Sequence, residues 1–233
     1  MVQGVIVAAG SGSRLYPVTD IVPKFLLPIG YDLKPMGQLV LEHCKEHGIT
    51  DFVFCLNAQT GKQIYNYFGD GARFGVSIEY SMSNEGQGTS GEVRLAYDRG
   101  LIKTPALIYY GDTLCRTNLT EMMSIGSFAT VVVNKDMRMP YGFVEANGGY
   151  ALRVIEKPTI SEMIPESNVG AIRAIYYVQN PLFWDMCRKD IDISRDILPK
   201  MLKMGAPLGV YQDTADFLDV GDWKNYGRAL KWK

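Results

Sequence analysis

The chain has 233 residues, of which 47% are hydrophobic and 21% are charged, a balance typical of a globular protein with a substantial buried core. Its formal net charge of −1 gives no electrostatic reason to expect nucleic acid or an anionic membrane as a partner. No apolar run is long enough to cross a bilayer, and no basic leader precedes the first apolar strand, so we expect a cytoplasmic protein.

Apolar runs and amphipathic patterns alternate through the first half of the chain. Residues 5–9 form a predicted strand, and residues 34–48 form a predicted helix that ends at a glycine. The alternation continues with predicted strands at 51–57, 76–82 and 105–111 and with predicted helices at 61–69 and 90–100. Because short turns join these segments, the pattern predicts βαβ units, with helices on both faces of a mostly parallel sheet.

The second half of the chain has a different pattern. A strand at 129–133 continues the sheet, and residues 141–158 predict two short strands joined by a glycine turn, which would add antiparallel material to the sheet. The remaining predicted segments are a strand at 174–180, helices within 181–189 and 194–204, short strands at 208–212 and 217–221, and a closing helix at 222–233 with Asp222 as its N-cap. We therefore expect one domain over 1–233, a Rossmann-like three-layer α/β sandwich with a mostly parallel mixed sheet and a small inserted antiparallel lobe.

The cysteines and histidines give little support for a metal site. The four cysteines are scattered without a C-x-x-C pair, so we expect reduced and mostly buried thiols. His43 and His47 are the only histidines and lie one helical turn apart, a spacing that suits a metal. Because they lie near the end of the helix predicted at 34–48, a favourable charge or cap at its C-terminus explains them better.

A glycine-rich loop follows the first predicted strand in the run VIVAAGSGSRLYPVTDIVPKFLLPIG, residues 5–30. The loop does not fit a dinucleotide-binding motif, because Pro17 stands where that motif would continue as a helix. Successive backbone N–H groups from Gly10 to Ser13 can instead cradle an anion, Arg14 offers a fork of donors to phosphate oxygens, and Lys24 adds a point charge. A surface loop with two solvated cations is the alternative, and the combination of features favours phosphate binding.

The run A-A-G-S-G-S-R-L-x-P-x-T, followed by P-K-x-L-L-P-I, resembles the N-terminal motif of the sugar-phosphate nucleotidylyltransferases. Phe25 stands where that family often has proline. The resemblance implies that a segment around the nucleotide phosphates includes Ala8, Gly10, Ser11, Gly12, Ser13 and Arg14. It also implies that Lys24 lies between the nucleotide and the sugar phosphate, that residues 1–115 bind the nucleotide and that residues 116–233 bind the sugar.

Two aspartates are candidate metal ligands. Asp112, in the run YYGDTL, follows a predicted strand at the edge where open α/β sheets bind ligands, and a carboxylate there can hold Mg²⁺. An ordinary turn or helix cap is the better explanation for a bare Gly-Asp pair, but the family carries a metal motif at this position. The resemblance also makes Asp219, in FLDVGDW, the second metal-type carboxylate.

The resemblance assigns further residues to the base and to the sugar phosphate. Gly88 and Thr89, in NEGQGTSG, would lie beside the base, although Gln87 replaces the usual leucine and Ser83 falls where a glutamine is common. On the sugar side, the resemblance implies that Tyr141 and Gly142 let the sugar approach the backbone, that Glu156 accepts hydrogen bonds from sugar hydroxyls and that Lys157 pairs with the sugar phosphate. A surface ion pair is the alternative for Glu156 and Lys157.

Arg173 has two readings. It lies next to the predicted strand at 174–180, where the family has a small residue, so it could approach an acidic or phosphate-rich sugar. The other reading, which we favour at this point, places its side chain in solvent at a strand edge.

The function expected from these features is the reaction of a nucleoside triphosphate with a sugar-1-phosphate to give a nucleoside-diphosphate-sugar and pyrophosphate. Arg14, Lys24 and Lys157 would be the catalytic cations and Mg²⁺ the cofactor. A glycosyltransferase is one alternative, for which the chain offers only Asp190-Ile191-Asp192 as a D-x-D motif. A non-catalytic regulatory subunit is another, although it would be expected to have lost these cations. The base, the sugar and any self-association as a homo-oligomer are left open.

Overall fold

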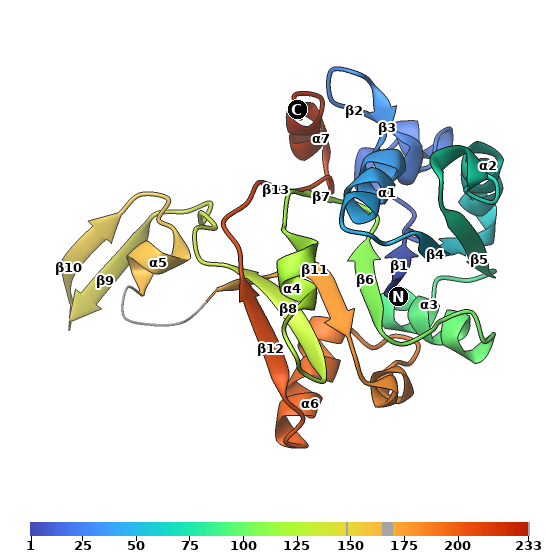
Figure 1. Ribbon diagram of the computed structural model, residues 1–233. Helices are drawn as coiled ribbons and strands as arrows, with labels where there is room; N and C mark the ends of the chain where they lie inside the picture. The colour runs from blue at the N-terminus through green and yellow to red at the C-terminus, as the bar shows by residue number, and fades with distance from the viewer. Residues whose placement is uncertain (148, 165–169, 233) are drawn as a thin grey trace.

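A central sheet organises the structure, a computed structural model that describes residues 1–147, 149–164 and 170–232 (Figure 1). Within these described residues the sheet has seven strands in the order β12-β8-β11-β6-β1-β4-β5. Their bounds are β1 Gln3–Val7, β4 Asp51–Asn57, β5 Ser77–Ser83, β6 Ala106–Tyr110, β8 Ala129–Asn134, β11 Ala171–Val178 and β12 Leu208–Gln212. The pairings of β1 with β4 and β6, of β4 with β5 and of β8 with β12 are parallel, whereas β11 is antiparallel to both of its neighbours.

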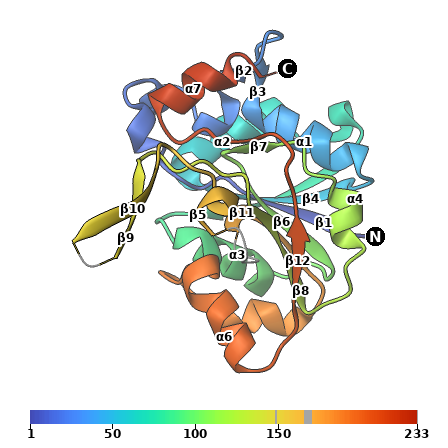
Figure 2. The same cartoon turned by 90° about the vertical axis from the view of Figure 1, so that its left-hand side faces the viewer.

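Side chains that alternate along the central strands are buried on opposite faces of this sheet. Ile6 and Phe54 pack on one face with helices α1 (Met36–Glu46), α2 (Ala58–Phe68) and α4 (Leu119–Met123). Val5 and Val53 pack on the other face with α3 (Gly88–Asp98) and α6 (Leu198–Lys203) (Figure 2). Because a strand directs successive side chains to opposite faces, the unbroken apolar runs of β1 and β4 require a helical layer on each side. The predicted three-layer α/β sandwich is therefore confirmed.

The small antiparallel lobe is present as predicted, but its strands do not extend the central sheet as expected. Strands β9 (Phe143–Asn147) and β10 (Tyr150–Ile155) form a separate two-stranded sheet that projects from the body (Figure 1) and do not join the central sheet. Nearly all of their side chains are exposed, including the apolar Val144, Leu152 and Val154, so the hairpin does not pack against the core. Gly148, in the predicted turn, lies outside the described residues. The antiparallel member of the central sheet is β11 instead.

Several element boundaries also move for identifiable reasons. Helix α2 begins at Ala58, before the predicted residue 61, because the Asn57 side chain accepts a hydrogen bond from the Thr60 N–H at 2.8 Å and caps the helix. The segments predicted as helices in the second half contain a 3₁₀ stretch at Pro181–Met186 and a π-helical turn at Ile193–Ile197, which leads into α6. Asp222 caps the final helix α7 (Trp223–Ala229), as predicted.

Small elements complete the chain around the sheet. Strand β7 (Thr113–Cys115) follows β6 and pairs antiparallel with β13 (Phe217–Asp219), while β2 (Pro28–Ile29) pairs with β3 (Lys34–Pro35). Helix α5 (Ile160–Met163) follows the projecting hairpin. Within the described residues, no helix has the length and hydropathy needed to cross a membrane.

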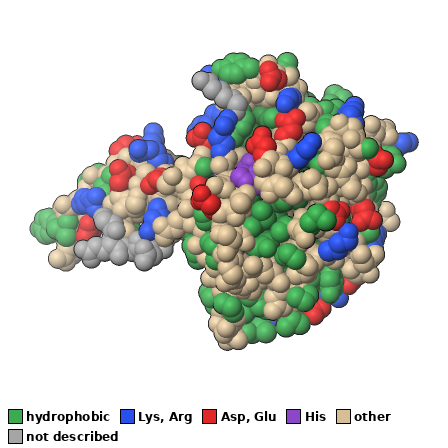
Figure 3. Space-filling view, viewed as in Figure 1, with side chains coloured by type: hydrophobic (Ala, Val, Ile, Leu, Met, Phe, Trp, Pro, Cys, Tyr) green, Lys and Arg blue, Asp and Glu red, His purple; other side chains and the backbone are tan. Residues whose placement is uncertain are grey.

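The cysteines and histidines have structural roles. All four cysteines are free and buried, as expected. His43 Nε2 lies 2.9 Å from the Thr117 carbonyl oxygen and His47 Nδ1 lies 2.9 Å from Thr120 Oγ1, so both rings connect the last turns of α1 to the segment after β7. Histidine atoms are visible on one face of the molecule, with acidic and basic side chains nearby (Figure 3). No group of three or more metal-ligating side chains is present in the described part of the chain.

Candidate active site

A cavity of about 630 Å³ opens at the carboxyl ends of the parallel strands β1, β4, β5 and β6. Residues at or after the end of each of these strands line the cavity. They lie within 8–12 at β1, 57–60 at β4, 84–89 at β5 and 111–112 at β6. Because parallel strands end at the same edge, residues from four distant parts of the chain meet there. The predicted residues that line the cavity are Ala8, Gly10, Ser11, Gly12, Lys24, Gly88, Thr89 and Asp112.

The glycine loop is held in shape by side chains from two other segments. Gly12 has φ 68°, and a Cβ at this position would lie only 2.8 Å from Cγ2 of Thr19, so glycine is required there. Thr19 Oγ1 donates to the Gly12 carbonyl at 3.0 Å, and Asn57 Nδ2 donates to the Ala9 carbonyl at 2.7 Å. The loop is therefore preorganised as a concave backbone surface before any ligand binds.

Arg14 lies beside the cavity, and its guanidinium lies next to Gly221, close to Asp219. Ser13 and Arg14 belong to a 3₁₀ turn (Ser13–Leu15) and are not among the described residues that line the cavity. The Arg14 guanidinium packs against Gly221: a Cβ there would lie 2.9 Å from Nη2 of Arg14 and 3.1 Å from Oδ1 of Asp219. Any larger residue at position 221 would push the guanidinium and the carboxylate away.

Two carboxylates and two cations form a compact cluster at the cavity edge. Lys24 Nζ lies 2.8 Å from Asp112 Oδ2, and the Lys24 side chain is only 12% exposed. Burial raises the pKa of Asp219, the negative charge of Asp112 raises it further, and Lys24 and Arg14 oppose the rise. The two carboxylates therefore lie close enough to repel each other, a situation that a divalent cation would relieve.

This donor set fits Mg²⁺. Both candidate ligands offer carboxylate oxygen, the donor that a hard cation prefers. Because no third carboxylate, histidine or cysteine joins them among the described residues, the other ligands would be substrate phosphates and water.

Glu92 is a site residue that the sequence patterns did not reveal. It lines the cavity from the first turns of α3, yet it is only 2% exposed. Its Oε1 accepts hydrogen bonds from Ser83 Oγ at 2.7 Å and from the Gln87 N–H at 3.2 Å, whereas Oε2 has no hydrogen-bond partner within the described residues. Glu92 thus ties the end of β5 to the loop that leads into Gly88. Glu92 directly precedes the buried Val93 in α3, and an acidic residue at that position gives no local signal of such a role.

The predicted sugar-side residues gather on the projecting hairpin. Tyr141 is 72% exposed, and a Cβ on Gly142 would lie 2.8 Å from Oε2 of Glu156. Lys157 Nζ lies 3.7 Å from Glu156 Oε1, and both side chains are mostly exposed. The structure therefore brings these four residues together, but none of them is among the described residues that line the cavity.

The structure contradicts the solvent reading of Arg173. Its side chain is 2% exposed, so it does not face solvent. Its guanidinium pairs with Asp213 at 2.8 Å and donates to the Ala215 carbonyl at 2.8 Å, and its role at the sugar stays a prediction. The physical reason is that residue 173 faces the packed side of β11, together with Ile175 and Tyr177.

Comparisons with known proteins agree with this geometry. The family model described as nucleotidyl transferase matches residues 3–231. The UTP–glucose-1-phosphate uridylyltransferase of Synechocystis sp. is 29% identical over 252 residues, covering 98% of this chain and 62% of that protein. The glucose-1-phosphate thymidylyltransferase of Mycobacterium tuberculosis is 34% identical over 187 residues, covering 76% of this chain and 61% of that protein. The chain thus spans about three fifths of the length of these relatives.

A solved structure shares the fold. The crystal structure of HddC from Yersinia pseudotuberculosis superimposes with a TM-score of 0.72 at 20% identity, covering 98% of both chains. At this level of identity the likeness concerns the arrangement of helices and strands.

The buried carboxyl of Glu92 should make stability depend on pH. Burial is the main cause that raises its pKa above the ordinary 4.5, and the hydrogen bonds from Ser83 and Gln87 oppose it. A carboxyl with a raised pKa in the folded state contributes stability that is present below 4.5 and is lost as pH rises through the folded pKa. As pH rises through this range, the unfolding free energy of the wild type should fall relative to that of Glu92→Gln. The fall should be about 1.4 kcal/mol for each unit by which folding raises the pKa of Glu92.

Urea unfolding of both proteins between acidic and neutral pH measures this difference. Glu79→Gln, on an exposed position of β5, controls for the loss of one carboxylate. A difference between the Glu92→Gln variant and the wild type that does not change with pH would contradict the assignment.

Proposed function

The chain belongs to the nucleotidyl transferase family, among the sugar-phosphate nucleotidylyltransferases, and we propose that it joins a sugar-1-phosphate to a nucleoside triphosphate with release of pyrophosphate. One observation carries the proposal: a preorganised glycine loop, Lys24 and Asp112 line one cavity, with Asp219 and Arg14 beside it. Backbone N–H groups and cations suit a triphosphate, and the paired carboxylates suit its cation.

The chemistry needs little proton transfer. A phosphate monoester has a second pKa of about 6, so the attacking sugar-phosphate oxygen is already largely ionised at neutral pH. In-line attack on the α-phosphorus then breaks the bond to the β-phosphate and releases pyrophosphate. Catalysis reduces to holding two polyanions together and neutralising the charge that they share.

The residues of the cluster supply that neutralisation. An ammonium group has three donors, so Lys24 can keep its bond to Asp112 and still donate to a phosphate oxygen. The Arg14 fork lies beside Asp219 and can meet a second phosphate oxygen. Mg²⁺ held by Asp112 and Asp219 would supply further charge on the transferring phosphate.

The hairpin residues complete the proposal on the sugar side. Tyr141, Gly142, Glu156 and Lys157 lie together, as a common binding surface requires. We propose that the sugar approaches Tyr141 and Gly142, that its hydroxyls donate to Glu156 and that its phosphate meets Lys157. A sugar phosphate bound next to Lys24 would bridge the cavity and the hairpin.

The base and the sugar are not assigned by these observations. The matched relatives include uridylyl-, thymidylyl- and guanyltransferases by name, and Ser83 and Gln87 depart from the family pattern at the base side. The division into parts at 1–115 and 116–233, the cytoplasmic location and any self-association stay predictions.

The glycosyltransferase alternative lacks support from the D-x-D motif. The Asp192 side chain accepts the Arg195 N–H at 2.7 Å and caps the π-helical turn, while Asp190 N–H donates to the Gln87 carbonyl at 3.2 Å. The Asp192 carboxylate therefore serves the local backbone. A dead regulatory subunit is also disfavoured, because the cations and carboxylates of the cluster are all present.

Pyrophosphate release over a matrix of nucleoside triphosphates and sugar-1-phosphates, with Mg²⁺, tests the proposed function. We expect one or a few combinations to turn over and Asp112→Asn to abolish that turnover, because it removes the charge that Lys24 and the cation share. Circular dichroism should show that the variant is folded. Near-normal release by Asp112→Asn would contradict the metal assignment, and silence of the wild type across the matrix would favour the non-catalytic alternative.

Lys157→Ala should separate the two substrates. We expect its KM for the sugar-1-phosphate to rise by at least about tenfold, a loss of about 1.4 kcal/mol, while the dissociation constant of the triphosphate stays near that of the wild type. Lys103→Ala, another exposed lysine with an acidic neighbour, Asp51, is the matched control. Equal losses for both substrates would exclude the proposed role of Lys157.

A further inference from the structure

The segment that carries Asp219 lies along the segment that follows Asp112. Residues 217–219 of β13 pair antiparallel with Cys115, Leu114 and Thr113 of β7. Two backbone hydrogen bonds extend this ladder: Arg116 N–H donates to the Asp216 carbonyl at 3.0 Å, and Val220 N–H donates to the Asp112 carbonyl at 2.9 Å. The register of this ladder therefore decides whether the carboxylate of Asp219 lies beside that of Asp112.

Apolar burial favours one face of this ladder, because Leu218 and Val220 are buried in one cluster with Leu114. The ladder is short, with three residue pairs, and aspartates recur every third residue at 213, 216, 219 and 222. A slip of one residue would turn every side chain of the segment to the opposite face and move Asp219 away from Asp112. Burial of Leu218 and Val220 disfavours such a slip, and contacts outside so short a ladder would add to the selection of one alignment.

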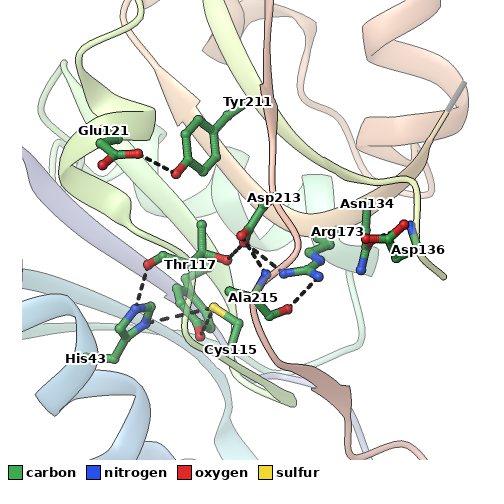
Figure 4. A network of polar contacts seen from close by, with 11 residues as sticks. His43, Cys115, Thr117, Glu121, Asn134, Asp136, Arg173, Tyr211, Asp213 and Ala215 are labelled. Atoms are coloured by element: carbon green, nitrogen blue, oxygen red, sulfur yellow. Dashed lines mark hydrogen bonds and ion pairs between the residues drawn. The ribbon is translucent and has the colours of Figure 1, made fainter. Parts of the chain in front are cut away.

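A buried ion pair holds the far end of the segment (Figure 4). Arg173 Nη1 lies 2.8 Å from Asp213 Oδ2, and Thr117 Oγ1 donates to the same oxygen. Arg173 Nη2 donates to the Ala215 carbonyl at 2.8 Å, and the Ala215 N–H donates to Asp213 Oδ1 at 2.8 Å. The Asp213 N–H is in turn bound to the Val133 carbonyl in β8 at 2.9 Å.

The position of this ion pair ties the segment to both sheets. Arg173 comes from β11 of the central sheet, Thr117 follows β7, and Asp213 begins the connection from β12 to β13. The guanidinium also lies over the ring of Phe217, with Cζ 4.8 Å from the ring centroid. Each contact is compatible with a single alignment of Asp213, Ala215 and Phe217 along the β7 segment.

Burial makes this selection strong. The side chains of Arg173 and Asp213 are 2% and 7% exposed, so a charge without its partner would be left in a low-dielectric interior. A buried pair of this kind often adds little net stability over apolar side chains of the same size, and its best-attested use is the choice of register. Misaligned forms of the segment would separate the charges and are disfavoured.

We propose that Arg173 is a positioning residue for the active site, which fixes the register of residues 213–220 so that Asp219 faces Asp112. The role of Asp219 as a metal ligand rests on the proposed function. The register itself does not, because it follows from contacts among residues of this chain.

The test compares three variants with the wild type. Arg173→Met combined with Asp213→Leu removes both buried charges together and leaves no unpaired one. Arg173→Lys keeps the charge but cannot hold Asp213 and the Ala215 carbonyl with one rigid fork. Arg94→Met combined with Asp98→Leu, an ion pair on α3 away from this segment, is the matched control.

Two measurements are made on each folded protein without substrates. The first is Mn²⁺ binding followed by electron paramagnetic resonance, with Mn²⁺ as a spectroscopic substitute for Mg²⁺. The second is hydrogen exchange of the backbone amides at 217–220, compared with amides of β1 and β4. Thermal unfolding shows how far each variant changes global stability.

We expect the Arg173/Asp213 double variant to bind Mn²⁺ about 10–100-fold more weakly, as is typical when a group that orients a metal ligand is lost. Exchange at 217–220 should accelerate while that of β1 and β4 is unchanged, and Arg173→Lys should fall between the double variant and the wild type. The control pair should change neither measurement. If the double variant does not fold, the comparison is made with Arg173→Lys.

Wild-type Mn²⁺ affinity and unchanged exchange in the double variant would overturn the inference. If the wild type shows no pyrophosphate release in the substrate matrix, while exchange at 217–220 still depends on Arg173, the proposed function fails and the positioning role stands. Where turnover is present and exchange at 217–220 is insensitive to Arg173, the positioning role fails alone.

Discussion

The parallel alignment of β1 between β4 and β6 is the constraint on which the site depends. Val7 of β1 pairs with Cys55 of β4 and with Tyr110 of β6, so β1 and β6 end at the same level and β4 ends two residues beyond it. The loops that follow them must therefore meet, and they bring the glycine loop, Asn57 and Asp112 to one cavity. The apolar cores on both faces keep this alignment, because a shift of one residue in β1 would expose its buried side chains.

Charge balance governs what that cavity can hold. Asp112 is neutralised by Lys24, and Asp219 lies between the repulsion of Asp112 and the attraction of Arg14. Without ligand the cluster contains two positive and two negative charges, so each charged group has a neighbour of the opposite sign. A triphosphate with its cation adds both signs at once and can enter without leaving any of the four groups uncompensated. This balance fits a site for a metal–nucleotide complex better than a site for either component alone.

The sequence was informative wherever the signal was local. Alternating apolar patterns predicted the sheet and its helical layers, and the spacing of glycine and lysine in the opening run identified residues that line one cavity. The burial of Arg173 was not predicted, because its partner Asp213 lies 40 residues away and shares no local pattern with it. Its position in β11, in step with the buried Ile175 and Tyr177, was the available signal that the side chain points inward. The hairpin was misplaced because strand patterns do not say which sheet a pair of strands will join.

Glu92 and Arg173 show the same physical logic at opposite ends of the site. Each is a charged group buried beneath a segment that carries site residues, and each bonds that segment at two places: Glu92 at Ser83 and Gln87, Arg173 at Asp213 and Ala215. Apolar side chains could fill either space, but they would hold the segments without direction, since dispersion contacts tolerate small shifts that a buried hydrogen bond does not. Directional bonds from rigid elements therefore order two segments of the site, the loop that leads into Gly88 and the segment that carries Asp219. Such buried charges belong to the machinery of the site even though their role is to hold other residues in place.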